Sequence, residues 1–453
     1  MVTLAHQAHS QAVSEHESAG QGLYKRAKRL IPGGTQLLSK RPEMFLPEQW
    51  PAYYSQAKGV EVIDLNGLRY VDMSVMGVGA CVLGYGDPEV DDAVKEAVDR
   101  GVMCTLNAPE EVGLGELLCE LHPWADMVRY AKSGGEAMSI AIRIARAHTR
   151  RDRVAFCGYH GWSDWYLAAN LGDHDALDGH LLPGLSPVGV PKGLQGTALP
   201  FHYNHINELK TIVQAHGQEL AAIVLEPQPG QQVVPGFLEE IRDIATEIGA
   251  VLIFDEITTG FRMTSGGIHL LLGVTPDVAV FAKAMANGYP MSVVIGVEEV
   301  MQAAQSTFIS STNWTERIGL AAAIATIRKH RRENVAAHLM VIGNMVKSGW
   351  EKIAQHVGLP LHVYGHPSLA HFGFDHEDNV LLTSLFTQMM LGKGYLAGDQ
   401  FKASFAHQAD HVAEYLDAVS ETFMALADAV SWGEVSTRLK GPPAQKGFYR
   451  LTS

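Results

Sequence analysis

The fold is decided by the stretch Phe254-Asp255-Glu256-Ile257-Thr258-Thr259-Gly260. This stretch closes the apolar run 250–254, which is typical of a strand buried on both faces of a sheet. Burying an unpaired carboxylate such as that of Asp255 is costly, so we expect a cation beside it. In open α/β sheets, ligands bind at the carboxyl ends of the strands. The missing cation is therefore expected on a ligand.

A second strand of the same kind is predicted at 277–282, and it ends in Lys283. A buried acid and a buried lysine at the ends of two strands suit pyridoxal 5′-phosphate (PLP). Asp255 would pair with the protonated pyridine nitrogen, and Lys283 would form the Schiff base. The two strand ends therefore predict an enzyme that uses PLP.

Composition excludes several classes of partner. With 453 residues, 47% of them hydrophobic and 19% charged, the chain is expected to fold into two or three domains. The formal net charge of −14 argues against nucleic acid and anionic membranes, because both require a basic surface. No apolar run is long enough to span a membrane, and residues 1–20 lack the apolar stretch of a signal peptide.

The cysteines and histidines do not predict a metal site. Four widely spaced cysteines fit reduced thiols in a cytoplasmic protein better than a disulfide framework or a zinc site. His407 and His411 have the spacing of a helical metal pair, but the glutamate of the metalloprotease motif is absent. We interpret them as two histidines on a surface helix.

A phosphate site is predicted in the segment 127–136, where a strand turns into a helix. Ser133 and Glu136 have the spacing of a capping box, so these residues could serve only to start the helix. Gly134 and Gly135 would in addition leave backbone N–H groups open to an anion at the positive end of the helix dipole.

Strands and helices alternate over residues 127–300, which predicts an α/β fold with a mostly parallel sheet covered on both faces. One strand is expected at 153–157 and another at 221–225. The first leads to Tyr159, which either packs in the core or stacks on a planar ring. The second ends in a carboxylate, Glu226.

A long helix is expected at 315–332, where the chain leaves this domain. We expect an N-terminal arm and part of a small domain at 1–60. The large PLP-binding domain would span 61–315, and the rest of the smaller α+β domain would span 316–453.

Taken in order, these motifs resemble the class III, fold-type I PLP-dependent aminotransferases, and in particular the branch of glutamate-1-semialdehyde 2,1-aminomutase. A more specific resemblance is to the aminotransferase that makes 8-amino-3,8-dideoxy-manno-octulosonate, an amino sugar acid of bacterial lipopolysaccharide. The resemblance covers residues 30–407. It rests on Ser133-Gly134-Gly135-Glu136, Tyr159-His160-Gly161, Glu226-Pro227, Asp255-Glu256, Gly260-Phe261-Arg262 and Lys283.

The resemblance implies a seven-stranded sheet and a complete PLP site. Lys283 would hold PLP and then move the proton of the substrate. Tyr159 would stack on one face of the ring, and Ile257, where the family usually has valine, would pack on the other. His160 would belong to the same cofactor site, and Glu226 would lie near the phenolic oxygen and the lysine.

The resemblance also implies a homodimer with shared active sites, in the cytoplasm that the cysteines predict. Ser133, Gly134 and Gly135 would bind the phosphate, and Thr312 would reach the phosphate of the neighbouring subunit. The family usually has serine or threonine at position 135, so one side-chain contact to the phosphate would be absent here.

The substrate side departs from the family pattern. The aminomutase arginine that binds the substrate carboxylate aligns with Lys40, with Arg41 adjacent, and lysine lacks the bidentate fork of arginine. We therefore expect an aminotransferase that uses an amino acid donor, glutamate, and an aldehyde or ketone acceptor. Two alternatives remain: an intramolecular aminomutase, and a non-catalytic binding protein, which would have no need of Lys283.

Overall fold

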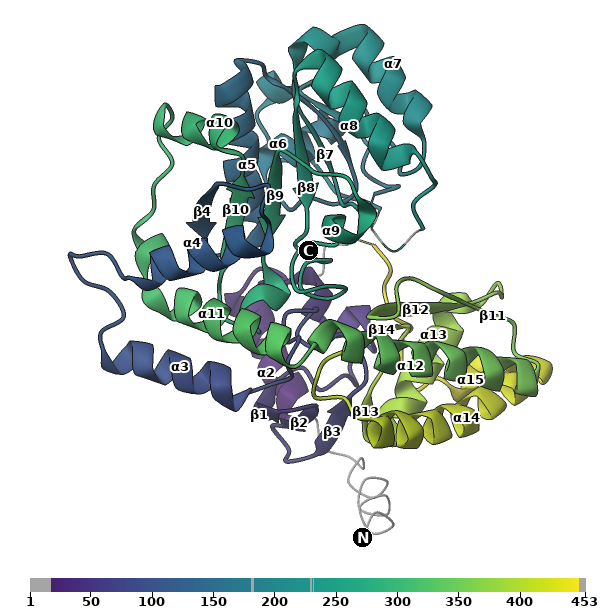
Figure 1. Ribbon diagram of the computed structural model, residues 1–453. Coiled ribbons are helices and arrows are strands. Elements are labelled where there is room, and N and C mark those ends of the chain that lie inside the picture. Colours follow the sequence, from purple (N-terminus) through teal and green to yellow (C-terminus); the bar gives the residue numbers. More distant parts are fainter. Residues whose placement is uncertain (1–17, 181–182, 229, 231, 448–453) are drawn as a thin grey trace. The chain divides into compact units, whose positions relative to one another are not determined.

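The computed structural model describes residues 18–180, 183–228, 230 and 232–447 (Figure 1). The chain divides into two compact units. The sheet unit comprises residues 88–337, and the discontinuous unit comprises residues 18–87 and 338–447 among those described.

The apolar run before Asp255 forms β8 (Val251–Asp255), the middle strand of a seven-stranded sheet. The strand order is β4 (Met127–Ala131), β10 (Ser292–Gly296), β9 (Val278–Phe281), β8, β7 (Leu220–Leu225), β5 (Arg153–Cys157) and β6 (Ala198–Pro200). The strands β9, β8, β7, β5 and β6 pair in parallel, and β10 is antiparallel to both of its neighbours. The predicted mostly parallel sheet of seven strands is confirmed.

The alternation of side chains along β8 explains why the run is apolar throughout. Val251 and Ile253 belong to a hydrophobic cluster with helix α5 (Gly134–Thr149). Leu252 and Phe254 belong to the cluster on the opposite face, with helices α7 (Ile206–His216) and α8 (Phe237–Ile248). Both faces of the sheet are therefore covered, as expected of a parallel sheet.

The register between β8 and β9 positions the site. Asp255 pairs with Val280, so the end of β8 lies close to the end of β9 at Phe281. Lys283 follows two residues later, at the start of a 3-10 turn, η6 (Lys283–Ala286). Asp255 and Lys283 thus meet at the same carboxyl edge of the sheet.

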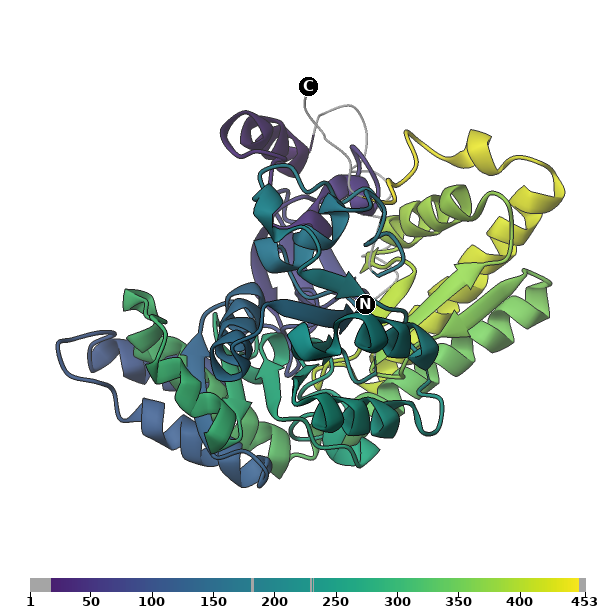
Figure 2. The same cartoon turned by 90° about the horizontal axis from the view of Figure 1, so that it is seen from above.

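The sheet unit ends later in the chain than the sequence suggested. Helix α11 (Arg317–Arg332) packs on α3 (Pro88–Asp99) and α4 (Glu110–Leu121), and both views show it running beside α3 (Figures 1 and 2). This packing keeps α11 in the sheet unit, whereas the sequence predicts a domain boundary at residue 315.

The discontinuous unit also takes more of the N-terminal region than expected. The predicted hairpin forms β2 (Glu61–Asp64) and β3 (Arg69–Asp72), and β1 (Tyr54–Lys58) extends it. Strand β3 pairs in parallel with β13 (Tyr395–Leu396). This long-range pairing places residues 61–87 in the discontinuous unit, whereas the sequence predicts a boundary at residue 60.

The rest of the discontinuous unit is α+β. Strands β11 (Leu361–Tyr364), β12 (Leu369–Phe374) and β14 (Gln400–Lys402) form an antiparallel sheet. The helices are α2 (Ala19–Leu30), α12 (Val335–Val357), which starts at the end of the sheet unit, α13 (Asn379–Gly392), α14 (Ala409–Ser431) and the short α15 (Val435–Arg438). In the described ranges, no helix is both long and apolar enough to cross a membrane.

The interpretation of His407 as a surface residue is wrong. His407 lies before α14 and is fully buried. Its Nδ1 accepts from the Ser404 amide at 3.0 Å, and its Nε2 donates to the Asp72 carbonyl oxygen at 2.9 Å. Burial lowers the pKa of His407 to about 4, so it links two chain segments as a neutral ring.

All four cysteines are free.

Candidate active site

Asp255 is paired with His160 at the end of β8. Asp255 is 3% exposed, and its Oδ2 lies 2.8 Å from His160 Nδ1. The other oxygen, Oδ1, accepts from the Ile257 amide at 3.0 Å. His160 Nε2 donates to the Cys157 carbonyl oxygen at 2.9 Å, so the ring is held from both sides. The structure thus brings His160 to Asp255, and the carboxylate keeps a fixed orientation.

Lys283 lies beside these residues in a strained backbone conformation. Its φ of 46° is in the left-handed region, which is unfavourable for a residue with a Cβ, and strained residues of this kind cluster at functional sites. Its Nζ donates to Thr258 Oγ1 at 2.8 Å. Burial lowers the pKa of Lys283, although the nearby carboxylates Glu226 and Asp255 oppose this shift. A lowered pKa makes the amine more available as a nucleophile.

Glu226 lies at the end of β7, next to the strand that carries Asp255. Its Oε1 accepts from the Tyr159 amide at 3.4 Å. Burial, and then the charge of Asp255, raise the pKa of Glu226 to about 7, while His160 and Lys283 oppose the shift. Glu226 can therefore hold a proton near neutral pH, close to the lysine.

This raised pKa predicts a pH dependence of stability. Glu226 has an ordinary pKa of 4.5, so the folded protein binds this proton more tightly than the unfolded chain does. The contribution of Glu226 to the free energy of unfolding of the cofactor-free protein should therefore fall as the pH rises from 4.5 to about 7, against the opposite contribution of buried histidines such as His407. In urea unfolding across this window, the free energy of unfolding of the wild type relative to Glu226→Gln should fall as the pH rises. Glu239→Gln, on the exposed face of α8, should keep the wild-type dependence, and an unchanged profile in Glu226→Gln would contradict the assignment.

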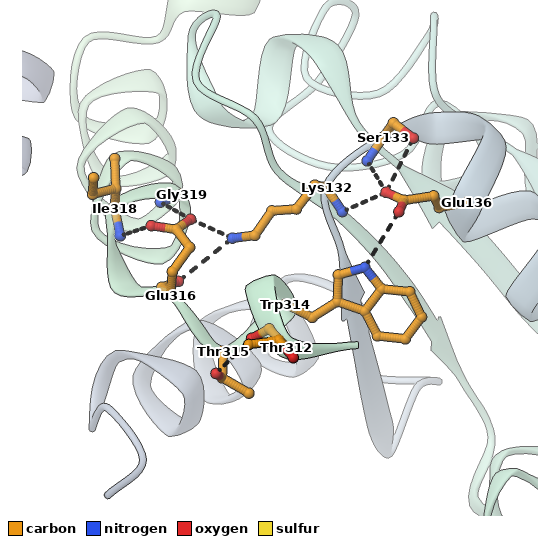
Figure 3. Close-up of polar contacts among 9 residues, drawn as sticks. All are labelled: Lys132, Ser133, Glu136, Thr312, Trp314, Thr315, Glu316, Ile318 and Gly319. Carbon is orange, nitrogen blue, oxygen red and sulfur yellow. Dashed lines mark hydrogen bonds and ion pairs between the residues drawn. The ribbon is translucent and has the colours of Figure 1, made fainter. Parts of the chain in front are cut away.

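The turn before α5 has the shape of a phosphate cradle. Ser133 and Glu136 form the predicted capping box, in which Glu136 Oε2 accepts from the Ser133 amide at 2.9 Å (Figure 3). A Cβ on Gly134 would lie 2.8 Å from Ile257, and one on Gly135 would lie 3.0 Å from Trp162 Nε1. A larger residue at either position would require Ile257 or Trp162 to shift, whereas glycine allows close approach to the first N–H groups of the helix, which suit an anion. The residues therefore fit the phosphate of PLP.

Tyr159 and Ile257 both lie beside Asp255. Tyr159 is 37% exposed, and its ring meets Tyr166 edge to face at 5.8 Å. Burial, followed by the charge of Asp255, raises the pKa of Tyr159, so it stays neutral. Ile257 is partly buried against the α5 cluster. An aromatic and an aliphatic side chain close to the carboxylate suit the two faces of a planar ring.

Thr312 begins the short turn η8 (Thr312–Thr315), and its side chain is exposed. The same turn reaches the capping box, because Trp314 Nε1 donates to Glu136 Oε1 at 3.5 Å (Figure 3). Next to it, Lys132 and Glu316 form an ion pair (Figure 3). The Thr312 segment is thus anchored beside the phosphate cradle of its own chain. The contact with the phosphate of a neighbouring subunit stays a prediction.

Lys40 and Arg41 belong to the discontinuous unit. Lys40 is exposed at the end of a 3-10 turn, η1 (Leu38–Lys40). Arg41 packs on the glycine turn, since a Cβ on Gly33 would lie 2.3 Å from its guanidinium group. That contact gives Arg41 a structural role, and a role of either residue toward substrate stays a prediction.

The sequence interpretation missed the residues that brace the Asp255 turn. Glu256 is fully buried, and its Oε1 accepts from the His269 amide at 3.0 Å and from Nδ1 at 2.8 Å. Trp124 Nε1 donates to His269 Nε2 at 3.0 Å. Thr258, which contacts Lys283, lies on the same turn. Only the polarity of Glu256 and Thr258 after a buried strand could have indicated them.

An acid and a lysine at the carboxyl edge of a mostly parallel sheet, with a glycine cradle beside them, define a PLP-dependent enzyme of fold type I. The Aminotransferase class-III family matches residues 47–408, so the chain belongs to that family. It is therefore a PLP-dependent aminotransferase, and the alternative of a non-catalytic binding protein is not supported.

Similar proteins agree with this assignment. The chain is 34% identical to 3-aminobutyryl-CoA aminotransferase of Cloacimonas acidaminovorans, over 81% of this chain and 86% of that protein. It is 33% identical to glutamate-1-semialdehyde 2,1-aminomutase of Nitratidesulfovibrio vulgaris, over 87% and 97%. Among solved structures, it is similar to the PLP internal aldimine form of the FumI protein of Sphingopyxis sp. MTA144. That match has a TM-score of 0.82 and 26% identity, and it covers 91% of this chain and 97% of that one.

Proposed function

We propose that the enzyme transfers the amino group of an amino acid, L-glutamate, to an aldehyde or ketone acceptor. The observation that carries the proposal is the convergence of Asp255, Glu226 and Lys283 at one edge of the sheet, beside the glycine cradle. PLP, when bound there, supplies an electron sink for the substrate carbon.

Each residue has a separate task in this proposal. Lys283 binds the cofactor, and then takes and returns the proton of the substrate carbon. Asp255 holds the proton on the pyridine nitrogen, and His160 keeps Asp255 oriented. Glu226, with its pKa near 7, holds a proton close to the lysine and the phenolic oxygen.

The remaining residues orient the cofactor. Ser133, Gly134 and Gly135 bind the phosphate at the start of α5, while Tyr159 and Ile257 hold the two faces of the ring. We further propose a cytoplasmic homodimer in which Thr312 reaches the partner's cofactor. Large exposed apolar side chains in the sheet unit support such an interface, among them Leu106 (80% exposed) and Phe308 (85% exposed).

An oxidised sugar acid of lipopolysaccharide synthesis is one candidate acceptor, and Lys40 or Arg41 would bind its carboxylate. A coenzyme A thioester bearing a ketone is another, because a similar protein is a 3-aminobutyryl-CoA aminotransferase. A screen of sugar aldehydes, short-chain ketones and ketoacyl thioesters with glutamate as donor would separate these classes. Activity with none of the three classes would contradict the proposed range of acceptors.

The rival function is an intramolecular aminomutase, which the similarity to glutamate-1-semialdehyde aminomutase supports. The two differ in their need for a donor. We expect turnover to require added L-glutamate and to release one 2-oxoglutarate for each amine formed. Conversion of glutamate-1-semialdehyde without any added donor would favour the aminomutase instead. Lys40 in place of arginine supports the aminotransferase, because lysine cannot make the bidentate contact.

A further inference from the structure

The hydroxyl of Thr258 is the hydrogen-bond partner of the Lys283 amine. Lys283 Nζ donates to Thr258 Oγ1 at 2.8 Å. Within the described part of the chain, this is the one hydrogen bond of the Thr258 side chain. The charged groups that act on Lys283 are Glu226 at the end of β7, Asp255 at the end of β8, and Arg262. Thr258, in contrast, is uncharged, so its effect on the amine comes through the hydrogen bond alone.

The turn that carries Thr258 is fixed by its own contacts. The Glu256 amide donates to the Val280 carbonyl oxygen at 2.9 Å, which ties the turn to β9. The Gly260 amide donates to the Glu256 carbonyl oxygen at 2.8 Å, and the Thr259 hydroxyl donates to the buried Glu256 carboxylate. These contacts hold the backbone that carries Thr258 in place.

A hydroxyl suits an amine that changes its protonation state. An ammonium group has three donors and no acceptor, whereas a neutral amine also has a lone pair. A threonine hydroxyl can accept from the ammonium and, after rotation, donate to the neutral amine. The burial that lowers the pKa of Lys283 makes both states accessible.

We propose that Thr258 is a positioning residue that holds the Lys283 amine in both protonation states whenever it is not bonded to the cofactor. The amine takes a proton from the substrate carbon and later returns it, and Thr258 gains and loses none. This inference rests on the role of Lys283 in the proposed function. It assigns to this turn a task that goes beyond carrying Asp255 and Ile257.

The test compares Thr258→Val, which keeps the shape but removes the hydroxyl, with Thr258→Ser, which keeps the hydroxyl. The full chain loaded with pyridoxamine phosphate leaves the lysine amine unbonded. The reaction of this amine with an arylating reagent is then measured by peptide mass spectrometry over a pH series. The pH dependence of the reaction rate reports the titration of Lys283. A hydrogen bond to a charged group is stronger than one to a neutral group. The Val profile should therefore move to lower pH by about half a unit or more, while the Ser profile stays in place.

Kinetics gives a second readout. The rate of the glutamate half-reaction should fall about tenfold in Thr258→Val, with little change in the KM for glutamate. Thr211→Val is the matched control, because Thr211 lies on α7 and bonds only the Asn207 carbonyl oxygen in the described part of the chain. If Thr258→Val does not fold, Thr258→Ala replaces it and the same shift is expected. Wild-type profiles in the hydroxyl-free variant would overturn the inference.

The proposed function can fail separately. Borohydride reduction of the PLP-loaded enzyme, followed by peptide mapping, identifies the lysine that carries the cofactor. A lysine other than Lys283 would overturn the proposed function. Modification of Lys283, together with an unmoved titration in Thr258→Val, would overturn only the role of Thr258.

Discussion

Lys283→Ala is expected to remove the visible absorbance of the bound cofactor and to lower turnover by about 10⁴-fold. Two functions are lost together, because the alanine can neither bind the cofactor covalently nor move the proton of the substrate carbon. The neighbouring groups cannot replace the amine. Glu226 is a candidate base, but Lys283 lowers its pKa, so the loss of the lysine leaves this carboxyl group more protonated near neutral pH.

The matched control is Lys192→Ala, since Lys192 is exposed on a 3-10 turn of the same unit. It should keep both absorbance and turnover. The free energy of unfolding should change little in Lys283→Ala, because relief of the backbone strain at φ 46° is not expected from alanine, which also has a Cβ. Turnover within tenfold of wild type in a folded Lys283→Ala protein would rule out the assigned role.

The main parts of this site could be predicted because the strand signals were strong. An apolar run that ends in a carboxylate is unusual in a buried strand, so both Asp255 and Glu226 stood out in the sequence. The class of sheet followed from the alternation of strands and helices. The order of the strands could not follow, because it depends on which apolar faces pack together over long separations.

The parts that the sequence did not reveal depend on contacts between distant residues. Strand β3 joins the discontinuous unit through β13, and nothing near Arg69–Asp72 indicates this partner. His407 is buried because Asp72 offers it a carbonyl oxygen. The pairing of Thr258 with Lys283 likewise depends on the register of β8 and β9, which brings the turn to the lysine.

Asp255→Asn is expected to lower the rate of the glutamate half-reaction by about 10²–10³-fold. Asp255 is buried and faces His160, and in the proposed function it also faces the protonated pyridine nitrogen. Removing one preorganised electrostatic partner in an active site costs about 2.7–4 kcal/mol of transition-state stabilisation, and each 1.4 kcal/mol corresponds to a factor of ten in rate. Asparagine keeps the size of the side chain but has no negative charge to hold a proton on the ring nitrogen. The half-reaction is followed by the loss of cofactor absorbance after mixing with glutamate.

Asp277→Asn separates this electrostatic role from a structural one. Asp277 immediately precedes β9, at the end of the strand far from Lys283, where its Oδ2 accepts from the Leu252 amide at 2.7 Å and its Oδ1 pairs with Arg242. The loss of its charge should lower stability and leave the half-reaction unchanged. If Asp255→Asn, like Asp277→Asn, lowered stability and left the half-reaction unchanged, the role of Asp255 would be limited to its pairing with His160. The Asp255 carboxylate and the Lys283 amine lie at the same edge of the sheet. The proposed chemistry therefore requires both Asp255→Asn and Lys283→Ala to slow proton transfer, whereas Asp277→Asn, at the opposite end of the strand, should not.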